Sequence, residues 1–81
     1  LTIYPNPANE SVKVSFDNTL GGLIDIKLID QFGRIIMTEN NIQSYGSTVF
    51  TIDLVNLSEG MYTVQLASNQ NTISKRLIVR K

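Results

Sequence analysis

Residues 11–16 read Ser-Val-Lys-Val-Ser-Phe, and this strict alternation of polar and apolar residues decides the fold class. A period of two predicts a β-strand that carries Val12, Val14 and Phe16 on one face. The same alternation recurs outward along the chain at residues 24–28, 50–54 and 62–66. Strands that are apolar on one side only are typical of antiparallel sheets, which cover a core with one face and meet water with the other.

Turn-forming residues lie between these strands. Asp17-Asn18 and Gly21-Gly22 are expected to separate the first strand from the second, and residues 40–47 to form a longer polar connection. Gly33 is available for a positive φ in the turn at residues 31–34, and Asn69-Gln70-Asn71 is expected to close the last hairpin. Six or seven short strands at this spacing predict an all-β fold, an antiparallel β-sandwich, because a single sheet would leave its apolar face in water.

Three further features fit this scheme. Residues 35–37, Ile-Ile-Met, are continuously apolar and predict a strand pressed between neighbours. Leu57 lies just before a turn and is expected to fill part of the core. Pro5 and Pro7 lack a backbone N–H, which places the segment around them at the start of a strand or at a sheet edge.

The composition narrows the function. A chain of 81 residues is long enough for one domain, and a formal net charge of zero argues against a general nucleic-acid binder. The chain has no Cys and no His, so it offers no disulfide, no thiolate metal site and no histidine base. No apolar run approaches the length that spans a membrane. Because the chain does not begin with Met and shows no signal peptide, we expect residues 1–81 to be a fragment of a larger secreted protein.

The search for catalytic residues leaves few candidates. Asp25, Asp30 and Asp53 are the best carboxylates, and the expected strand positions make them solvated surface acids. Asp30 with neighbouring carbonyls is a possible calcium site, but the spacing lacks the dense acids of a calcium loop. A structural turn explains residues 30–34 better, since Asp30 can accept the backbone N–H two residues on and Arg34 can reach back to it.

The exposed aromatic residues bear on carbohydrate binding. Phe16, Phe50 and Tyr62 fall on predicted core faces, which leaves Phe32, Tyr45 and Tyr4 as surface candidates. These three residues lie in different turns, so they are not expected to form a continuous platform on which sugar rings could stack.

The end of the chain is its most distinctive charged feature. Residues 73–81 contain Lys75, Arg76, Arg80 and Lys81 and no acid. These cations flank an apolar strand in which Leu77 and Val79 share one face. Two explanations remain open: an edge strand that its charges protect from aggregation, or a docking strand whose edge and bases a receptor recognises.

Together these motifs resemble the type A C-terminal sorting domain of Bacteroidetes type IX secretion. The likeness covers the whole chain in order. It begins with Tyr4-Pro5-Asn6-Pro7-Ala8 and continues with Asp30, Gly33 and Arg34 as an Asp-x-x-Gly-Arg turn. It goes on through Asp53-Leu54, Leu57 and Gly60-Met61-Tyr62 and ends with Lys75-Arg76-Leu77-Ile78-Val79-Arg80-Lys81.

The resemblance implies a seven-stranded immunoglobulin-like sandwich at the C-terminus of a secreted cargo. It implies that the type IX translocon of the outer membrane recognises the domain after the cargo has reached the periplasm. A sortase-like peptidase then removes the domain by cutting before it, and the cargo is anchored at the cell surface or released. No enzyme activity, cofactor, metal, small-molecule substrate or nucleic acid is implied.

Within this picture, Lys75, Arg76, Arg80 and Lys81 are expected to present charge to the translocon, while Leu77 and Val79 hold the strand on the core. The other matching positions are expected to be structural; they are Pro5, Asn6, Pro7, Asp30, Gly33, Arg34, Asp53, Leu57, Gly60 and Tyr62. The alternatives are an accessory module that binds carbohydrate or protein, and an immunoglobulin-like spacer of a secreted hydrolase.

Overall fold

The protein is built from antiparallel strands, which confirms the predicted all-β class. A computed structural model describes residues 1–68 and 71–81, with the backbone alone for residues 19 and 20. Its five strands are β1 (Thr2–Tyr4), β2 (Ser11–Asp30), β3 (Ile35–Asp53), β4 (Gly60–Ala67) and β5 (Thr72–Val79). No helix long and apolar enough to cross a membrane occurs in these ranges.

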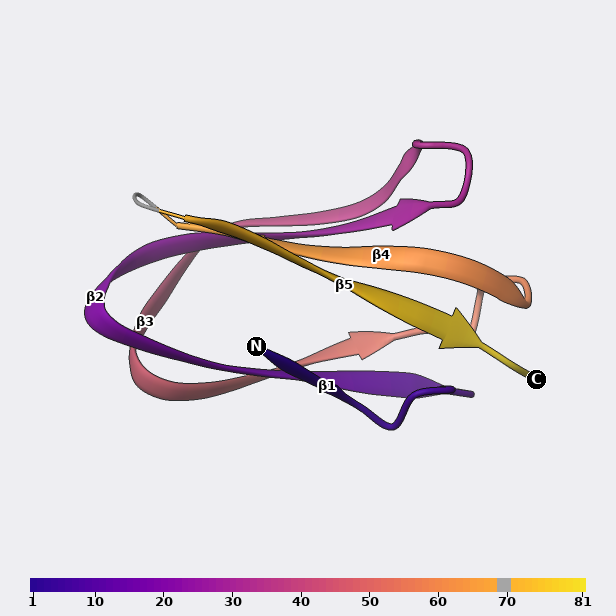
Figure 1. Cartoon of the computed structure of the whole chain (residues 1–81), viewed down its shortest axis with the longest axis horizontal. Helices are drawn as coiled ribbons and strands as arrows, with labels where there is room; N and C mark the ends of the chain where they lie inside the picture. Colours follow the sequence, from indigo (N-terminus) through magenta and orange to yellow (C-terminus); the bar gives the residue numbers. More distant parts are fainter. Residues whose placement is uncertain (69–70) are drawn as a thin grey trace.

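The two longest strands run through both layers of the molecule. β2 has 20 residues and β3 has 19, and Figure 1 shows the pair bending back over itself at the end where both are labelled. The first arm of β2 pairs with β1 and with the second arm of β3. The second arm of β2 pairs with the first arm of β3 and with β4, which in turn pairs with β5.

This arrangement corrects the predicted strand boundaries. Gly21-Gly22 does not end a strand, and residues 40–47 are not a connection, because β2 and β3 continue through them. Gly21, Gly22 and Gly46 have φ of 73°, 105° and 75°, and the register shifts between Asn18 and Gly22. These positions let the paired strands bend sharply while the ladder resumes beyond the bend.

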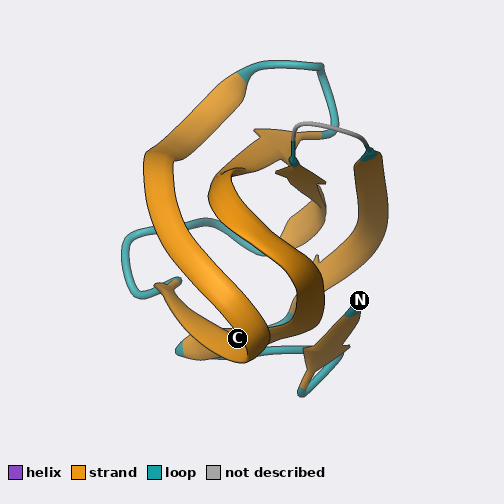
Figure 2. Ribbon diagram, turned by 90° about the vertical axis from the view of Figure 1, so that its left-hand side faces the viewer, coloured by secondary structure: helices purple, strands orange, loops and turns teal. Residues whose placement is uncertain are grey.

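The predicted sandwich of about seven short strands is therefore not confirmed in that form. The described strands form one sheet that folds over itself, and Figure 2 shows β2 and β3 curling side by side where they bend. The sheet nearly closes on its other side, where Ala8 and Val79 form an isolated parallel bridge. The predicted hairpin at Asn69-Gln70-Asn71 involves residues 69 and 70, which lie outside the described residues.

The core contains the residues that alternation predicts. Along β2, the second arm of β3, β4 and the end of β5, alternate side chains point inward. The buried apolar side chains are at most 8% exposed. The buried apolar set is Ala8, Val12, Val14, Phe16, Ile24, Ile26, Leu28, Ile52, Leu54, Tyr62, Val64, Leu66, Leu77 and Val79. Phe50 and Leu57 are half-buried and pack against this set, which confirms their predicted place.

Residues 35–37 do not lie between neighbouring strands, as their apolar sequence predicts. Ile35 is 56% exposed and Ile36 is 41% exposed. The reason is topological, since β3 pairs only with β2 and its other edge has no partner strand among the described residues. Met37, one residue further, packs partly against the core.

Candidate functional site

Strand β5 separates its apolar and charged side chains as the sequence predicts. Leu77 is fully buried and Val79 is 2% exposed, whereas Lys75, Arg76 and, one residue beyond the strand, Arg80 are exposed. β5 pairs along its whole length with β4, so its other edge faces away from the sheet. The strand is therefore fixed on the core by two residues and shows its cations to solvent.

The N-terminal segment covers part of the outer edge of β5. The side-chain amide of Asn6 donates from Nδ2 to the carbonyl of Arg76 at 3.0 Å, and its Oδ1 accepts the N–H of Ile78 at 3.0 Å. Ala8 donates its N–H to the carbonyl of Ile78 and accepts the N–H of Arg80, both at 2.8 Å. Asn6 thus supplies with its side chain the donor and acceptor that a neighbouring strand would supply with its backbone.

The two prolines explain why a side chain performs this task. Pro5 and Pro7 have no N–H to donate, so the segment between them cannot form a regular ladder. Their fixed φ angles hold Asn6 beside β5, and the backbone pairing resumes at Ala8. The expectation that these prolines lie at a sheet edge is correct, but sequence reasoning missed the role of Asn6 because its partners lie 70 and 72 residues away.

Lys81 differs from the other terminal cations. Its ammonium donates to the carbonyl of Leu54 at 2.9 Å and to that of Val55 at 3.4 Å. Its backbone N–H donates to Oε1 of Glu59 at 2.7 Å. These contacts tie the chain end to the loop before β4, whereas the side chains of Lys75, Arg76 and Arg80 have no hydrogen bond to any described residue.

The turn between β2 and β3 is organised by one carboxylate. Oδ1 of Asp30 accepts the backbone N–H groups of Phe32 and Arg34, each at 2.9 Å, and Oδ2 accepts Nε of Arg34 at 2.8 Å. Gly33 has a φ of 86°, as predicted, and donates its N–H to the carbonyl of Asp30. Burial acts to raise the pKa of the Asp30 carboxyl. The hydrogen bonds from Arg34 and Phe32, with the guanidinium charge, outweigh it, and the pKa is lowered.

This lowered pKa makes the turn sensitive to acid. An unfolded Asp titrates near pH ~3.9, so the carboxylate stabilises the fold above that pH and stops doing so as the pH falls through the lower folded-state pKa. We expect the free energy of unfolding of the parent chain to exceed that of Asp30→Asn at pH 7, and the difference to shrink below about pH 4. Urea unfolding of both chains between pH 7 and pH 2 measures it. A difference that stays constant over this range would contradict the assignment.

The other candidate carboxylates also serve local structure. Oδ1 of Asp53 accepts the N–H of Val55 at 2.9 Å, and Oδ1 of Asp25 accepts the N–H of Asn41 at 2.9 Å. Asn41 has a φ of 59°, so Asp25 supports the irregular point of β3. No group of three or more metal-type side chains occurs among the described residues.

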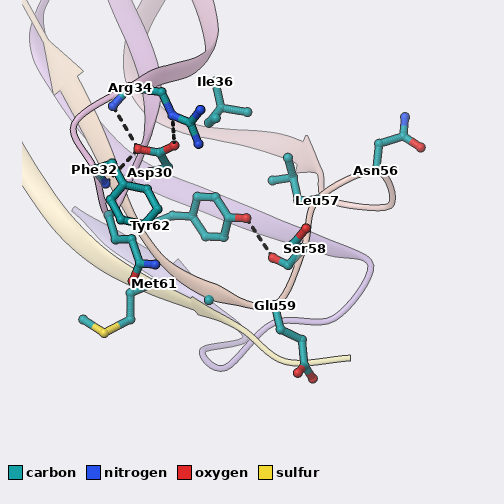
Figure 3. Close-up of a pocket in the computed structure, with 12 residues that line it drawn as sticks. Asp30, Phe32, Arg34, Ile36, Asn56, Leu57, Ser58, Glu59, Met61 and Tyr62 are labelled. Carbon is teal, nitrogen blue, oxygen red and sulfur yellow. Dashed lines mark hydrogen bonds and ion pairs between the residues drawn. The ribbon is translucent and has the colours of Figure 1, made fainter.

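Five of the family-like motif residues line one surface depression of about 310 Å³, although they come from separate parts of the chain. Asp30 and Arg34 line it from the β2–β3 turn, and Leu57, Gly60 and Tyr62 line it from the loop before β4 and from β4 itself. Figure 3 shows Tyr62 between these parts, with its hydroxyl directed at Ser58, whose carbonyl it reaches at 2.7 Å.

The rim of this depression contains residues that sequence analysis did not select for it. Phe32 is 74% exposed, and the Arg34 guanidinium lies 5.7 Å from the centre of its ring. Met61 and Ile36 also line the depression and are each about two-fifths exposed. The sequence signal that could have identified Phe32 was an aromatic residue within a polar turn. Its proximity to β4 depends on tertiary structure and is not visible in the sequence. Tyr4, Phe32 and Tyr45 are exposed as predicted, but they belong to separate elements and form no row.

Comparison with known protein families gives one match over nearly the whole chain. The family model described as "Secretion system C-terminal sorting domain" matches residues 2–80. A search of curated proteins returns no match.

Proposed function

Since the chain belongs to the family of secretion system C-terminal sorting domains, which serve type IX secretion, we propose that residues 1–81 are a single non-catalytic domain at the end of a larger secreted protein. The domain directs the preceding cargo from the periplasm through the outer membrane. The cargo ends in the medium or on the cell surface. The partners are the type IX translocon and a sortase-like peptidase that cuts before the domain.

The observation that carries this proposal is that the terminal strand has a buried apolar part and an exposed cationic part. Leu77 and Val79 are buried in the core, so the strand cannot leave the sheet without exposing them. Lys75, Arg76 and Arg80 remain exposed, without a hydrogen bond to the described residues. A rigid strand that presents cations suits recognition by an outer-membrane partner, because the ordering cost is already met in the free domain.

The remaining motif residues support this display. Asn6, between Pro5 and Pro7, holds the outer edge of β5, and Lys81 holds its end. Asp30, Gly33 and Arg34 form one turn; Asp53 organises the turn after β3, and Leu57, Gly60 and Tyr62 shape the neighbouring loop. We propose that these residues, apart from Lys81, act only through structure. The recognised segment is formed by Lys75, Arg76, Leu77, Val79, Arg80 and Lys81, of which Lys81 also anchors the chain end.

A fusion experiment tests the proposal. Residues 1–81 are attached to the C-terminus of a reporter that reaches the periplasm, in a host that carries the type IX system. We expect the reporter outside the outer membrane in this host, and in the periplasm of an otherwise equal host that lacks the translocon. Equal distributions in the two hosts would refute the proposed function.

A further inference from the structure

The depression beside Tyr62 has the form of a small binding site. At about 310 Å³ it lies at the lower end of the range of ligand pockets, which is roughly 300–1,000 Å³. Phe32, Ile36 and Met61 line it and remain between two-fifths and three-quarters exposed. Figure 3 shows Phe32 and Met61 to one side of Tyr62 and Leu57 to the other. Polar residues, among them Gln31, Asn56 and Ser58, line the rest of it. This size and mixed lining suit one apolar side chain of a peptide together with a polar neighbour.

Among the charged groups that line the depression, the guanidinium of Arg34 has donors without a partner in the described residues. Arg34 contacts Asp30 only through Nε, and its two terminal nitrogens make no hydrogen bond to any described residue, although the side chain is 72% exposed. The acids of the depression are already engaged, Asp30 by this turn and Glu59 by the N–H of Lys81. The free end of Arg34 is a planar donor pair that matches a carboxylate.

Neighbouring charges reinforce this preference. Gly60 at the depression pairs with Val79, and the exposed Arg80 is the next residue of the chain. Lys81 meets only neutral carbonyls with its ammonium. Arg80 and Lys81 thus place positive charge close to Glu59, whose carboxylate accepts the N–H of Lys81, and they offset its negative charge. Arg34 remains the group of the depression that can receive a carboxylate, so a ligand that carries one is favoured over a neutral ligand.

We propose that this depression binds a peptide segment of a partner protein in which an apolar side chain stands next to an acidic residue. The apolar side chain lies against Phe32, Met61 and Leu57, and the carboxylate accepts hydrogen bonds from the terminal nitrogens of Arg34. The inference rests on the proposed function in one respect, that the partner belongs to the secretion machinery. It adds a second contact surface to β5 and defines the chemistry of its ligand.

Three blocked peptides test the chemistry directly. They are acetyl-Gly-Phe-Glu-Gly-amide, the same peptide with Gln for Glu, and the same peptide with Ser for Phe. Titrations of the isotope-labelled chain, followed by backbone amide NMR shifts, give the site and the affinity. We expect the Phe-Glu peptide to shift the amides of Phe32, Arg34 and Met61, and to bind about tenfold more tightly than either control peptide.

Two variants assign the effect to the side chains. Phe32→Ala removes an exposed ring and leaves the N–H that Asp30 accepts, so the turn keeps its hydrogen bonds. Arg34→Lys keeps the charge but loses the paired donors. Each is expected to weaken the Phe-Glu peptide about tenfold or more, while Tyr45→Ala, a change at an equally exposed aromatic residue elsewhere, leaves binding unchanged. Equal binding of the three peptides, or shifts confined to other residues, would overturn the proposal.

The same variants separate this inference from the proposed function. In the reporter fusion, we expect Phe32→Ala to reduce export and Tyr45→Ala to leave it at the parental level. If the parent fusion is exported and Phe32→Ala is exported equally well, the depression has no part in sorting and the inference fails alone. If the parent fusion is not exported, the proposed function fails, whatever the peptides show.

Discussion

Replacing Leu77 by alanine is expected to lower the free energy of unfolding by about 2–5 kcal/mol, the usual cost of truncating a large buried side chain. Leu77 is fully buried, and it pairs with Tyr62, which is itself part of the core. A chain of 81 residues has a total stability of roughly 4–12 kcal/mol, so this one change removes a large share of it.

The matched control lies on the same strand. Ile73 pairs with Leu66 on β4 and alternates with Leu77, but it is 41% exposed because it lies toward the end of the sheet. Ile73→Ala is therefore expected to cost clearly less, about 1 kcal/mol, since two-fifths of the residue already meets water. Urea unfolding of the three chains measures both values. Equal losses for the two variants would show that β5 is not anchored through Leu77.

The alternation of single strands was enough to predict the core. The faces of residues 11–16, 24–28 and 62–66 are buried as their period of two requires, and Leu77 and Val79 follow the same rule. This signal is local and strong because each strand has one dry face. The Asp30 turn was predictable for a similar reason, since every one of its hydrogen bonds spans four residues or fewer.

The continuity of β2 and β3 could not be predicted in this way. Gly21-Gly22 and Gly46 carry the ordinary signal of a strand end, and whether such residues end a strand or only bend it depends on the pairing beyond them. Isolated sequence motifs do not report that pairing. The exposed position of Ile35 and Ile36 was missed for the same reason, because an edge strand and a central strand can share one sequence.

Contacts of the site that join distant segments of the chain could not be predicted from the sequence either. Asn6 and Arg76 are 70 residues apart, and the motif around Asn6 gives no sign that its amide completes the edge of β5. The depression is similar, because Phe32 and Met61 approach each other only through the pairing of β2 with β4. Motif recognition selected the candidate residues, and only the fold shows which of them lie together.

The second large effect concerns the charges of β5 and not its packing. The triple change Lys75→Gln, Arg76→Gln and Arg80→Gln is expected to reduce export of the reporter fusion to the level seen without the domain. All three side chains are exposed and without hydrogen bonds to the described residues, so stability should change by no more than about 0.5 kcal/mol per substitution. Lys81 is left in place because its ammonium holds the loop at Leu54 and Val55.

This design avoids a flaw of simple truncation. Deleting residues 74–81 would remove Leu77 and Val79 from the core and release the contacts of Lys81. A loss of export could then result from unfolding of the domain as readily as from the absence of the recognised cations. A control that also removes positive charge is Lys13→Gln with Lys27→Gln, which neutralises two lysines on β2, outside the terminal strand.

The most direct measurement is therefore the fraction of reporter found outside the cell for the parent, the triple glutamine variant and the β2 control, each shown to be folded by urea unfolding. If the exposed cations of β5 are what the secretion machinery recognises, the triple variant stays in the periplasm while the parent and the control are exported. Export of the folded triple variant at the parental level would contradict the account.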